Sequence, residues 1–171
     1  MDTVTLILLS ILPALTIVAG LHDLTTMKIP NWISLALLAG FFPAALAAGL
    51  DGWSLAGHLG VAAGALVLGA GLFALNWIGG GDAKLMAAAS LWMGLTGSLF
   101  FLAYTAMIGG LFCLILMSAR AYAPRYVHAG TPGWIAQLMR PKGDIPYGVA
   151  IAAGVLLAFP SSPLVQLFTG A

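Results

Sequence analysis

Residues 85–119, LMAAASLWMGLTGSLFFLAYTAMIGGLFCLILMSA, contain no charged side chain. A helix crosses a bilayer with about 20 mainly apolar residues, so this run is too long for a single crossing. It is most naturally broken at residues 94–98, GLTGS, because glycine and small polar residues favour a turn. The run therefore predicts two transmembrane helices joined by a short turn.

The whole chain has the composition of a membrane protein. Of its 171 residues, 61% are hydrophobic and only 6% are charged, and other apolar runs are separated by short polar breaks. We expect one all-α domain over residues 1–171, a polytopic membrane protein with six transmembrane helices and short connections. The predicted spans are residues 4–21, 32–50, 55–75, 83–94, 99–119 and 145–168. The fourth is short for a full crossing.

The basic residues predict the orientation of the chain, because Lys and Arg accumulate in cytoplasmic loops. With six spans, all of them fall on one side of the membrane: Lys28, Lys84, Arg120, Arg125, Arg140 and Lys142. Asp2 and Asp51 fall on the other side. The pattern predicts a multi-pass protein with both termini outside and three basic connections in the cytoplasm.

Two aspartates are the main candidates for chemistry in a sequence that has no glutamate. Asp23 closes the first predicted span and Asp82 opens the fourth, both at the cytoplasmic side. A carboxylate at membrane depth is costly and is by default a functional candidate. Two carboxyls brought together share a proton, which suits peptide hydrolysis by general acid–base catalysis. The alternative is that Asp82 only caps a helix and that Asp23 only ends one.

Three glycines, Gly79, Gly80 and Gly81, stand directly before Asp82. Without side chains they would let the backbone of a peptide come close. The N-terminus of the following helix would also favour negative charge at Asp82. The competing interpretation is that the glycines form only a flexible turn.

The residues around both aspartates resemble the paired motifs of the type IV prepilin peptidases. The resemblance rests on residues 23–31, DLTTMKIPN, residues 79–85, GGGDAKL, and residues 145–150, IPYGVA, which stand in the family's order. It implies that Asp23 and Asp82 are the catalytic aspartates of a GxGD intramembrane protease, which needs neither a metal nor a cofactor. Residues of these motifs would bind substrate or shape the site: Gly79, Gly80, Gly81, Lys28, Pro30, Asn31, Lys84 and Pro146. For the two lysines, contact with lipid headgroups is the competing interpretation.

The cysteine content indicates which branch of that family the chain resembles. Larger members carry a cytoplasmic part with paired Cys-x-x-Cys motifs and also methylate their product, whereas this chain has one cysteine, Cys113. The resemblance is therefore to the peptidase-only members of tight-adherence (Flp) pilus systems, without methyltransferase activity. It implies a prepilin or pseudopilin precursor whose short basic leader is cleaved at the cytoplasmic face of the bacterial inner membrane, with pilus assembly or secretion components as further partners.

Other functions have less support from the residues. The lack of glutamate excludes an HExxH zinc protease, and a net charge of +1 gives no support for a nucleic-acid partner. The rival hypothesis is a small proton-coupled transporter that uses Asp23 and Asp82 as proton carriers. Four smaller expectations concern single features: Asp144 caps the last span, His58 lies near the outer surface, Cys113 fills apolar space, and residues 133–140 form a short helix on the inner membrane surface.

Overall fold

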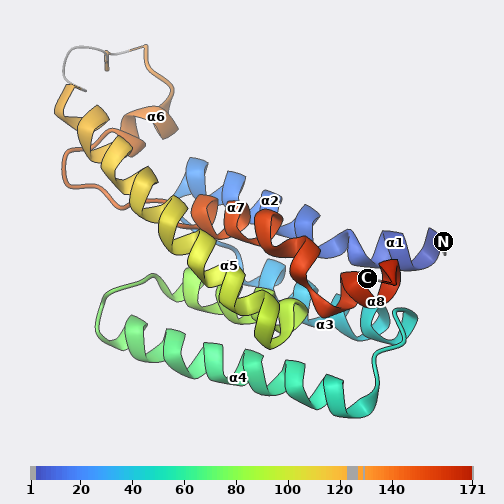
Figure 1. The fold of residues 1–171 in the computed structure, drawn as a ribbon. Coiled ribbons are helices and arrows are strands. Elements are labelled where there is room, and N and C mark those ends of the chain that lie inside the picture. Colours follow the sequence, from blue (N-terminus) through green and yellow to red (C-terminus); the bar gives the residue numbers. More distant parts are fainter. Residues whose placement is uncertain (1–2, 123–126, 129, 171) are drawn as a thin grey trace.

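The computed structural model describes residues 3–122, 127–128 and 130–170. All regular structure in this part of the chain is helical, which confirms the predicted fold class (Figure 1). Asp2 and Arg125, which entered the predicted orientation, lie outside the described residues. The helices are α1 (Thr3–Leu9), α2 (Ile11–Thr26), α3 (Asn31–Ala47), α4 (Gly52–Ala74), α5 (Gly80–Tyr122), α6 (Gly133–Leu138), α7 (Gly148–Ala158), the 3₁₀ turn η2 (Phe159–Ser161) and α8 (Pro163–Thr169).

Helix α5 is two helices that meet at a sharp reversal. Gly94 has φ 58° and ψ −168°, a backbone conformation that is not helical and that glycine adopts without strain. The Ser98 hydroxyl donates a hydrogen bond to the Ser90 carbonyl at 3.3 Å, although eight residues of straight helix would separate them by about 12 Å. The break predicted within residues 94–98 is therefore confirmed, and Figure 1 shows the chain turning back at this point.

The number of membrane crossings is only partly tested by the helix lengths. Three segments are long and apolar enough to cross: Thr3–Thr26, Gly52–Ala74 and Gly80–Tyr122. A fourth results if Gly148–Ser161 and Pro163–Thr169, bent by 40°, form one span. Helix α3 is apolar but has only 17 residues. Six spans thus remain a prediction, in which the reversal at Gly94 would supply one extra crossing.

Two predicted helix ends differ from the observed ones. A left-handed capping residue sets one of these ends, and a proline sets the other. The first span was expected to end at residue 21, but α2 continues to Thr26 and ends at Met27, whose N–H donates to the Asp23 carbonyl. Met27 has φ 56°, the left-handed conformation that commonly ends a helix. The last span was expected to be continuous to residue 168, but the chain bends where Pro163 starts α8.

The core is formed by side chains of α1, α2, α3, α7 and α8 that pack with both halves of α5. Trp92, fully buried, donates its indole N–H to the Leu37 carbonyl at 2.9 Å. His58 is only 4% exposed, and its Nδ1 lies 2.6 Å from the Leu91 carbonyl. Its ring also stacks on Phe41. His58 lines a cavity together with Asp51 and Thr96, and its expected place near the outer surface of the membrane stays a prediction.

Candidate active site

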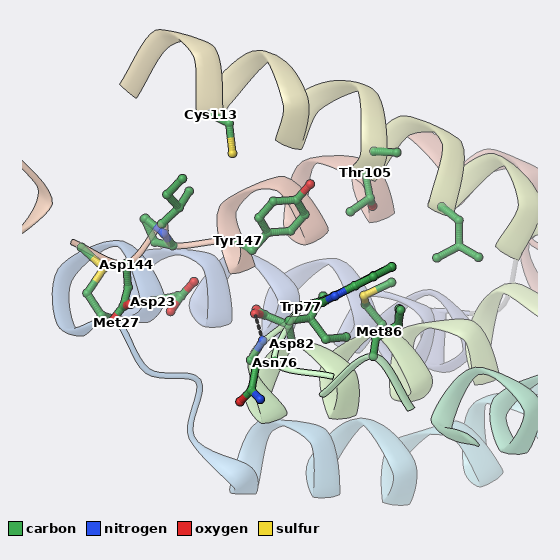
Figure 2. Close-up of a pocket in the computed structure, with 17 residues that line it drawn as sticks. Asp23, Met27, Asn76, Trp77, Asp82, Met86, Thr105, Cys113, Asp144 and Tyr147 are labelled. Carbon is green, nitrogen blue, oxygen red and sulfur yellow. Dashed lines mark hydrogen bonds between the residues drawn. The ribbon is translucent and has the colours of Figure 1, made fainter. Parts of the chain in front are cut away.

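A cavity of about 890 Å³ opens where four parts of the chain converge. They are the end of α2, the stretch from the end of α4 to the first turns of α5, the second half of α5, and the segment before α7 (Figure 2). The polar and reactive side chains on its wall are Asp23, Asn76, Asp82, Thr105, Cys113, Asp144 and Tyr147. Both aspartates predicted from the sequence therefore line one cavity.

Asp23 lies in the last turn of α2 and is only 6% exposed. Its Oδ2 accepts a hydrogen bond of 2.8 Å from the backbone N–H of Gly148, the first residue of α7. A buried carboxylate is costly unless such bonds replace the water that it loses. The start of α7, 125 residues further along the chain, therefore supports this side chain.

Asp82 lies in the first turn of α5 and is half-buried. Its Oδ2 accepts a hydrogen bond of 3.2 Å from the backbone N–H of Gly79, drawn as a dashed line in Figure 2. The two carboxyls are close enough for their charges to interact. Since neighbouring carboxylates repel, such a pair favours a state in which one member holds a proton.

The three glycines before Asp82 have different surroundings. Gly79 lines the cavity, and a Cβ on it would lie 2.9 Å from Asp82 Oδ2. A Cβ on Gly80 would lie 3.3 Å from the Phe73 ring, and one on Gly81 would lie 3.1 Å from the Cβ of Ile29. The cavity wall includes neither Gly80 nor Gly81. These two glycines allow α5 to pack closely on its neighbours, and only Gly79 is placed to meet a ligand in the cavity.

The other predicted site residues are divided between the cavity and its surroundings. Pro146 lines the cavity. Lys84 Nζ donates to Asn31 Oδ1 at 3.0 Å, and both residues line a separate groove of about 490 Å³ between α3, α4 and α5. Pro30 is the N-cap of α3, and the Lys28 carbonyl lies 2.7 Å from Nδ1 of His22. Lys28, Pro30, Asn31 and Lys84 are thus not among the residues that line the cavity.

Several residues on or next to the cavity were missed or misjudged from the sequence. Asp144 was expected to cap the last helix, but Tyr147 is the N-cap of α7 and Asp144 lies on the cavity wall. Cys113, expected to be an apolar filler, also lines the cavity. The block IPYGVA was noticed, but the contact between Gly148 N–H and Asp23 has no signature in the sequence.

A buried arginine fixes the segment that leads to α7. Arg120, 8% exposed, donates to the carbonyls of Leu138 at 2.9 Å, Gly143 at 2.8 Å and Asp144 at 2.7 Å. Buried charges require such partners. The sequence predicted only that Arg120 is one of the basic cytoplasmic residues. A short helix was expected over residues 133–140, and α6 at Gly133–Leu138 confirms the helix. Its position on the inner membrane surface stays a prediction.

Neither of two comparisons with known proteins found a match, one with curated proteins and one with solved structures. Over the described residues, no group of three or more His, Cys, Asp or Glu side chains is arranged to hold a metal ion. The sequence pattern of the type IV leader peptidase family matches residues 10–114, which is more than half of the chain and contains both Asp23 and Asp82. The chain therefore belongs to the type IV leader peptidase family.

Proposed function

We propose that Asp23 and Asp82 are the catalytic dyad of this leader peptidase. The observation that carries the proposal is that both carboxyls line the same cavity although they are far apart in the sequence. Both lie in the part of the chain that matches the leader peptidase family. A volume of about 890 Å³ is large enough for a short extended stretch of peptide.

The proposed reaction is hydrolysis of one peptide bond without a covalent intermediate. The ionised aspartate takes a proton from a water molecule while the water oxygen attacks the scissile carbonyl carbon. The protonated aspartate donates a hydrogen bond to the carbonyl oxygen as negative charge develops there. When the C–N bond breaks, a proton passes to the leaving amine, and the dyad again holds one proton.

The electrostatics of the cavity support a basic leader as the part of the substrate that binds. Three carboxyl groups lie on its wall, those of Asp23, Asp82 and Asp144, and no Lys, Arg or His is found among the described residues that line it. A positively charged peptide segment complements such a wall. The substrate that we propose is an Flp-type prepilin or pseudopilin precursor, cleaved between its basic leader and its hydrophobic helix at the cytoplasmic face of the inner membrane.

The proposal includes peptidase activity without methyl transfer. It is supported by the sequence, which has a single cysteine and no paired Cys-x-x-Cys motifs. The product is then a pilin with a free N-terminal amine. Mass spectrometry of the processed pilin tests this, because a methylated N-terminus would be 14 Da heavier for each methyl group, and its presence would contradict this part of the proposal.

The test of the dyad is cleavage of a co-expressed Flp-type prepilin, followed on a gel. The unaltered chain should shorten the precursor, while Asp23→Asn and Asp82→Asn should each lower the rate by about 1,000-fold or more, since general acid–base groups contribute on this scale. Asp51→Asn is the matched control, because Asp51 caps α4 away from the cavity. Each variant is checked for accumulation in the membrane.

Two results would contradict the proposal. Normal cleavage by either cavity variant would show that its carboxyl is not needed for the reaction. Failure of the unaltered chain to process several cognate precursors would favour the rival hypothesis, a proton-coupled transporter using Asp23 and Asp82. That hypothesis would then be tested by proton uptake into vesicles that contain the purified protein.

A further inference from the structure

The two aspartates of the proposed dyad are held by hydrogen bonds of different quality. Gly148 N–H lies 2.8 Å from Asp23 Oδ2, and the bond is buried. Gly79 N–H lies 3.2 Å from Asp82 Oδ2, and that bond is exposed. Hydrogen bonds to an ionised acceptor are typically about 2.7 to 2.9 Å long, whereas 3.2 Å is at the long end of ordinary N–H···O bonds. The contact at Asp23 therefore has the length expected of a carboxylate.

A helix start next to each aspartate adds a favourable field for negative charge. Gly148 opens α7, which has 11 residues, and the unpaired N–H groups at a helix start favour an anion. Asp82 stands in the first turn of α5, so a helix start acts on it as well. These two effects are similar in kind, so they do not indicate which aspartate is ionised. The length and burial of the direct hydrogen bond do distinguish the two aspartates in this respect.

We propose that Gly148 is a positioning residue that keeps Asp23 as the ionised, water-activating member of the dyad and leaves the shared proton on Asp82. This inference rests on the proposed function and assigns the two roles that it left open. Asp82, half-buried and more weakly bonded, is then the group that donates a hydrogen bond to the scissile carbonyl and supplies the proton to the leaving amine.

Only glycine fits at position 148. A Cβ there would lie 2.9 Å from both the Cβ and Oδ2 of Asp23 and 3.1 Å from Cδ1 of Ile29. A separation under about 3 Å between such atoms is far inside van der Waals contact. Any larger residue would therefore push Asp23 away from the N–H that holds it, and the effect would pass through Asp23, not through a direct contact with substrate.

Few other titratable groups surround Asp23. Its neighbour on α2 is His22, whose ring is held by the Lys28 carbonyl and the Thr26 hydroxyl. The remaining groups face it across the cavity: Asp82 and Cys113 from α5, and Asp144 and Tyr147 from the segment before α7. Helices α3, α6 and α7, as described, contribute no titratable side chain. The pH dependence of cleavage should therefore be dominated by the coupled carboxyls.

The chain offers a matched pair of substitutions for the test. Gly148→Ala puts a Cβ 2.9 Å from Oδ2 of Asp23, and Gly79→Ala puts one 2.9 Å from Oδ2 of Asp82. Gly20→Ala is the packing control, because its Cβ would meet Ala152 and the Gly148 carbonyl at the same α2–α7 contact, and none of its three nearest atoms belongs to Asp23. The purified full-length chain and each variant are assayed between about pH 4 and 9 with a synthetic peptide that spans a prepilin leader junction.

The acid limb of the profile of kcat/KM against pH reports the ionisation of the member that acts as base. Gly148→Ala should move this limb to higher pH by about 0.5 to 1 unit, because the carboxylate loses a hydrogen bond that favours the charged form. Gly79→Ala and Gly20→Ala should leave the acid limb in place, whatever they do to the maximal rate. A purely structural role of Gly148 would lower the rate and leave the limb unmoved.

Three results would overturn the inference. Gly148→Ala could leave the acid limb of the profile unmoved, Gly79→Ala could move it as far as Gly148→Ala does, or Gly79→Ala alone could move it. In each case the unaltered chain still cleaves, so the proposed function survives. If the unaltered chain cleaves no leader peptide, both the inference and the proposed function fail.

A second measurement decides the roles if Gly148→Ala does not fold. Asn at position 82 keeps an N–H donor for the scissile carbonyl, whereas Asn at position 23 cannot take a proton from water. In long incubations with purified protein, the residual rate of Asp82→Asn should exceed that of Asp23→Asn by about tenfold. A residual rate for Asp82→Asn that is equal or lower would contradict the assignment.

Discussion

Asp144 puts a third carboxyl on the wall of a cavity that already contains Asp23 and Asp82. Arg120, at the end of α5, donates its three hydrogen bonds to backbone carbonyls, one of them the carbonyl of Asp144 itself. The arginine therefore fixes the position of Asp144 without a hydrogen bond to its carboxyl. An exposed carboxylate in this position is suited to attract a basic peptide.

We predict that Asp144→Asn raises KM for a leader peptide containing lysine or arginine by about two- to fivefold and leaves kcat unchanged. The effect is modest because Asp144 is exposed and water screens its charge. Steady-state kinetics with the purified chain measure it. The control is the same peptide with its basic residues replaced by glutamine, for which both proteins should have the same KM. An equal rise in KM for that neutral peptide would show that Asp144 acts through shape and not charge.

The pairing of Asp23 and Asp82 could be predicted from sequence because carboxylates are rare in the chain and both fall at one predicted membrane face. The support of Asp23 by Gly148 could not be predicted. A backbone N–H is present at every residue except proline, so nothing in the letter G marks this one as a donor to a side chain 125 residues away. The buried role of Arg120 was hidden for a similar reason, since its partners are carbonyls.

At the scale of helices, the wall of the cavity depends on how closely α7 approaches the second half of α5. Gly154 of α7 lies against Thr105 of α5, where a Cβ on the glycine would overlap the threonine Oγ1 and would lie 3.1 Å from the Phe101 carbonyl. Small residues allow helices to approach closely inside a membrane. Because α7 begins at the Gly148 N–H, this contact also determines where that donor lies.

We predict that Gly154→Ala destabilises the protein by about 1 to 3 kcal/mol, the usual cost of overpacking a close contact. Thermal unfolding in detergent, followed by circular dichroism, should show a lower midpoint than for the unaltered chain. Gly110→Ala on α5 is the control, since a Cβ at Gly110 meets nothing within 4 Å and alanine favours helix. A Gly154→Ala midpoint that matches the unaltered one would show that the α5–α7 contact is loose.

Helix boundaries were predictable where the backbone itself requires a particular residue. The reversal at Gly94 needs a left-handed φ, and glycine within GLTGS indicated it. The extension of α2 to Thr26 could not be predicted from the sequence, because polar residues at the end of an apolar run are compatible with either helix or loop. The structure places Asp23 inside the last helical turn, so the helix fixes its backbone and the contact with α7 holds its carboxyl.

At the scale of the whole molecule, two cavities mark opposite ends of the helix bundle. The one with the aspartates gathers the end of α2, the α4–α5 connection and the segment before α7. A second cavity, of about 630 Å³, gathers the α3–α4 connection at Asp51, the reversal at Thr96, and α8 up to Gly170. Helix α1 contacts α8, so the N- and C-terminal helices lie side by side (Figure 1). Along the chain, successive connections between helices thus lie in turn at one end of the bundle and then at the other. This alternation supports the six-span arrangement.

The final prediction concerns the number and direction of the crossings. In a Cys113→Ser background, single cysteines are introduced as Gly52→Cys, Thr96→Cys and Gly133→Cys, all at exposed positions. Gly52 and Gly133 have no atoms within 4 Å of an added Cβ. A maleimide that cannot cross the membrane should label the cysteines at 52 and 96 in intact cells, because six spans put them outside.

The cysteine at position 133 should react only after the cells are permeabilised, since the basic connections are expected in the cytoplasm. Retained cleavage of the prepilin shows that each variant is folded. Protection of position 96 in intact cells, with position 52 labelled, would contradict a crossing on each side of Gly94. The first half of α5, short for a full crossing, would then enter and leave the membrane from the cytoplasmic side. Labelling at 133 in intact cells would reverse the predicted orientation and move the aspartate cavity to the outer face.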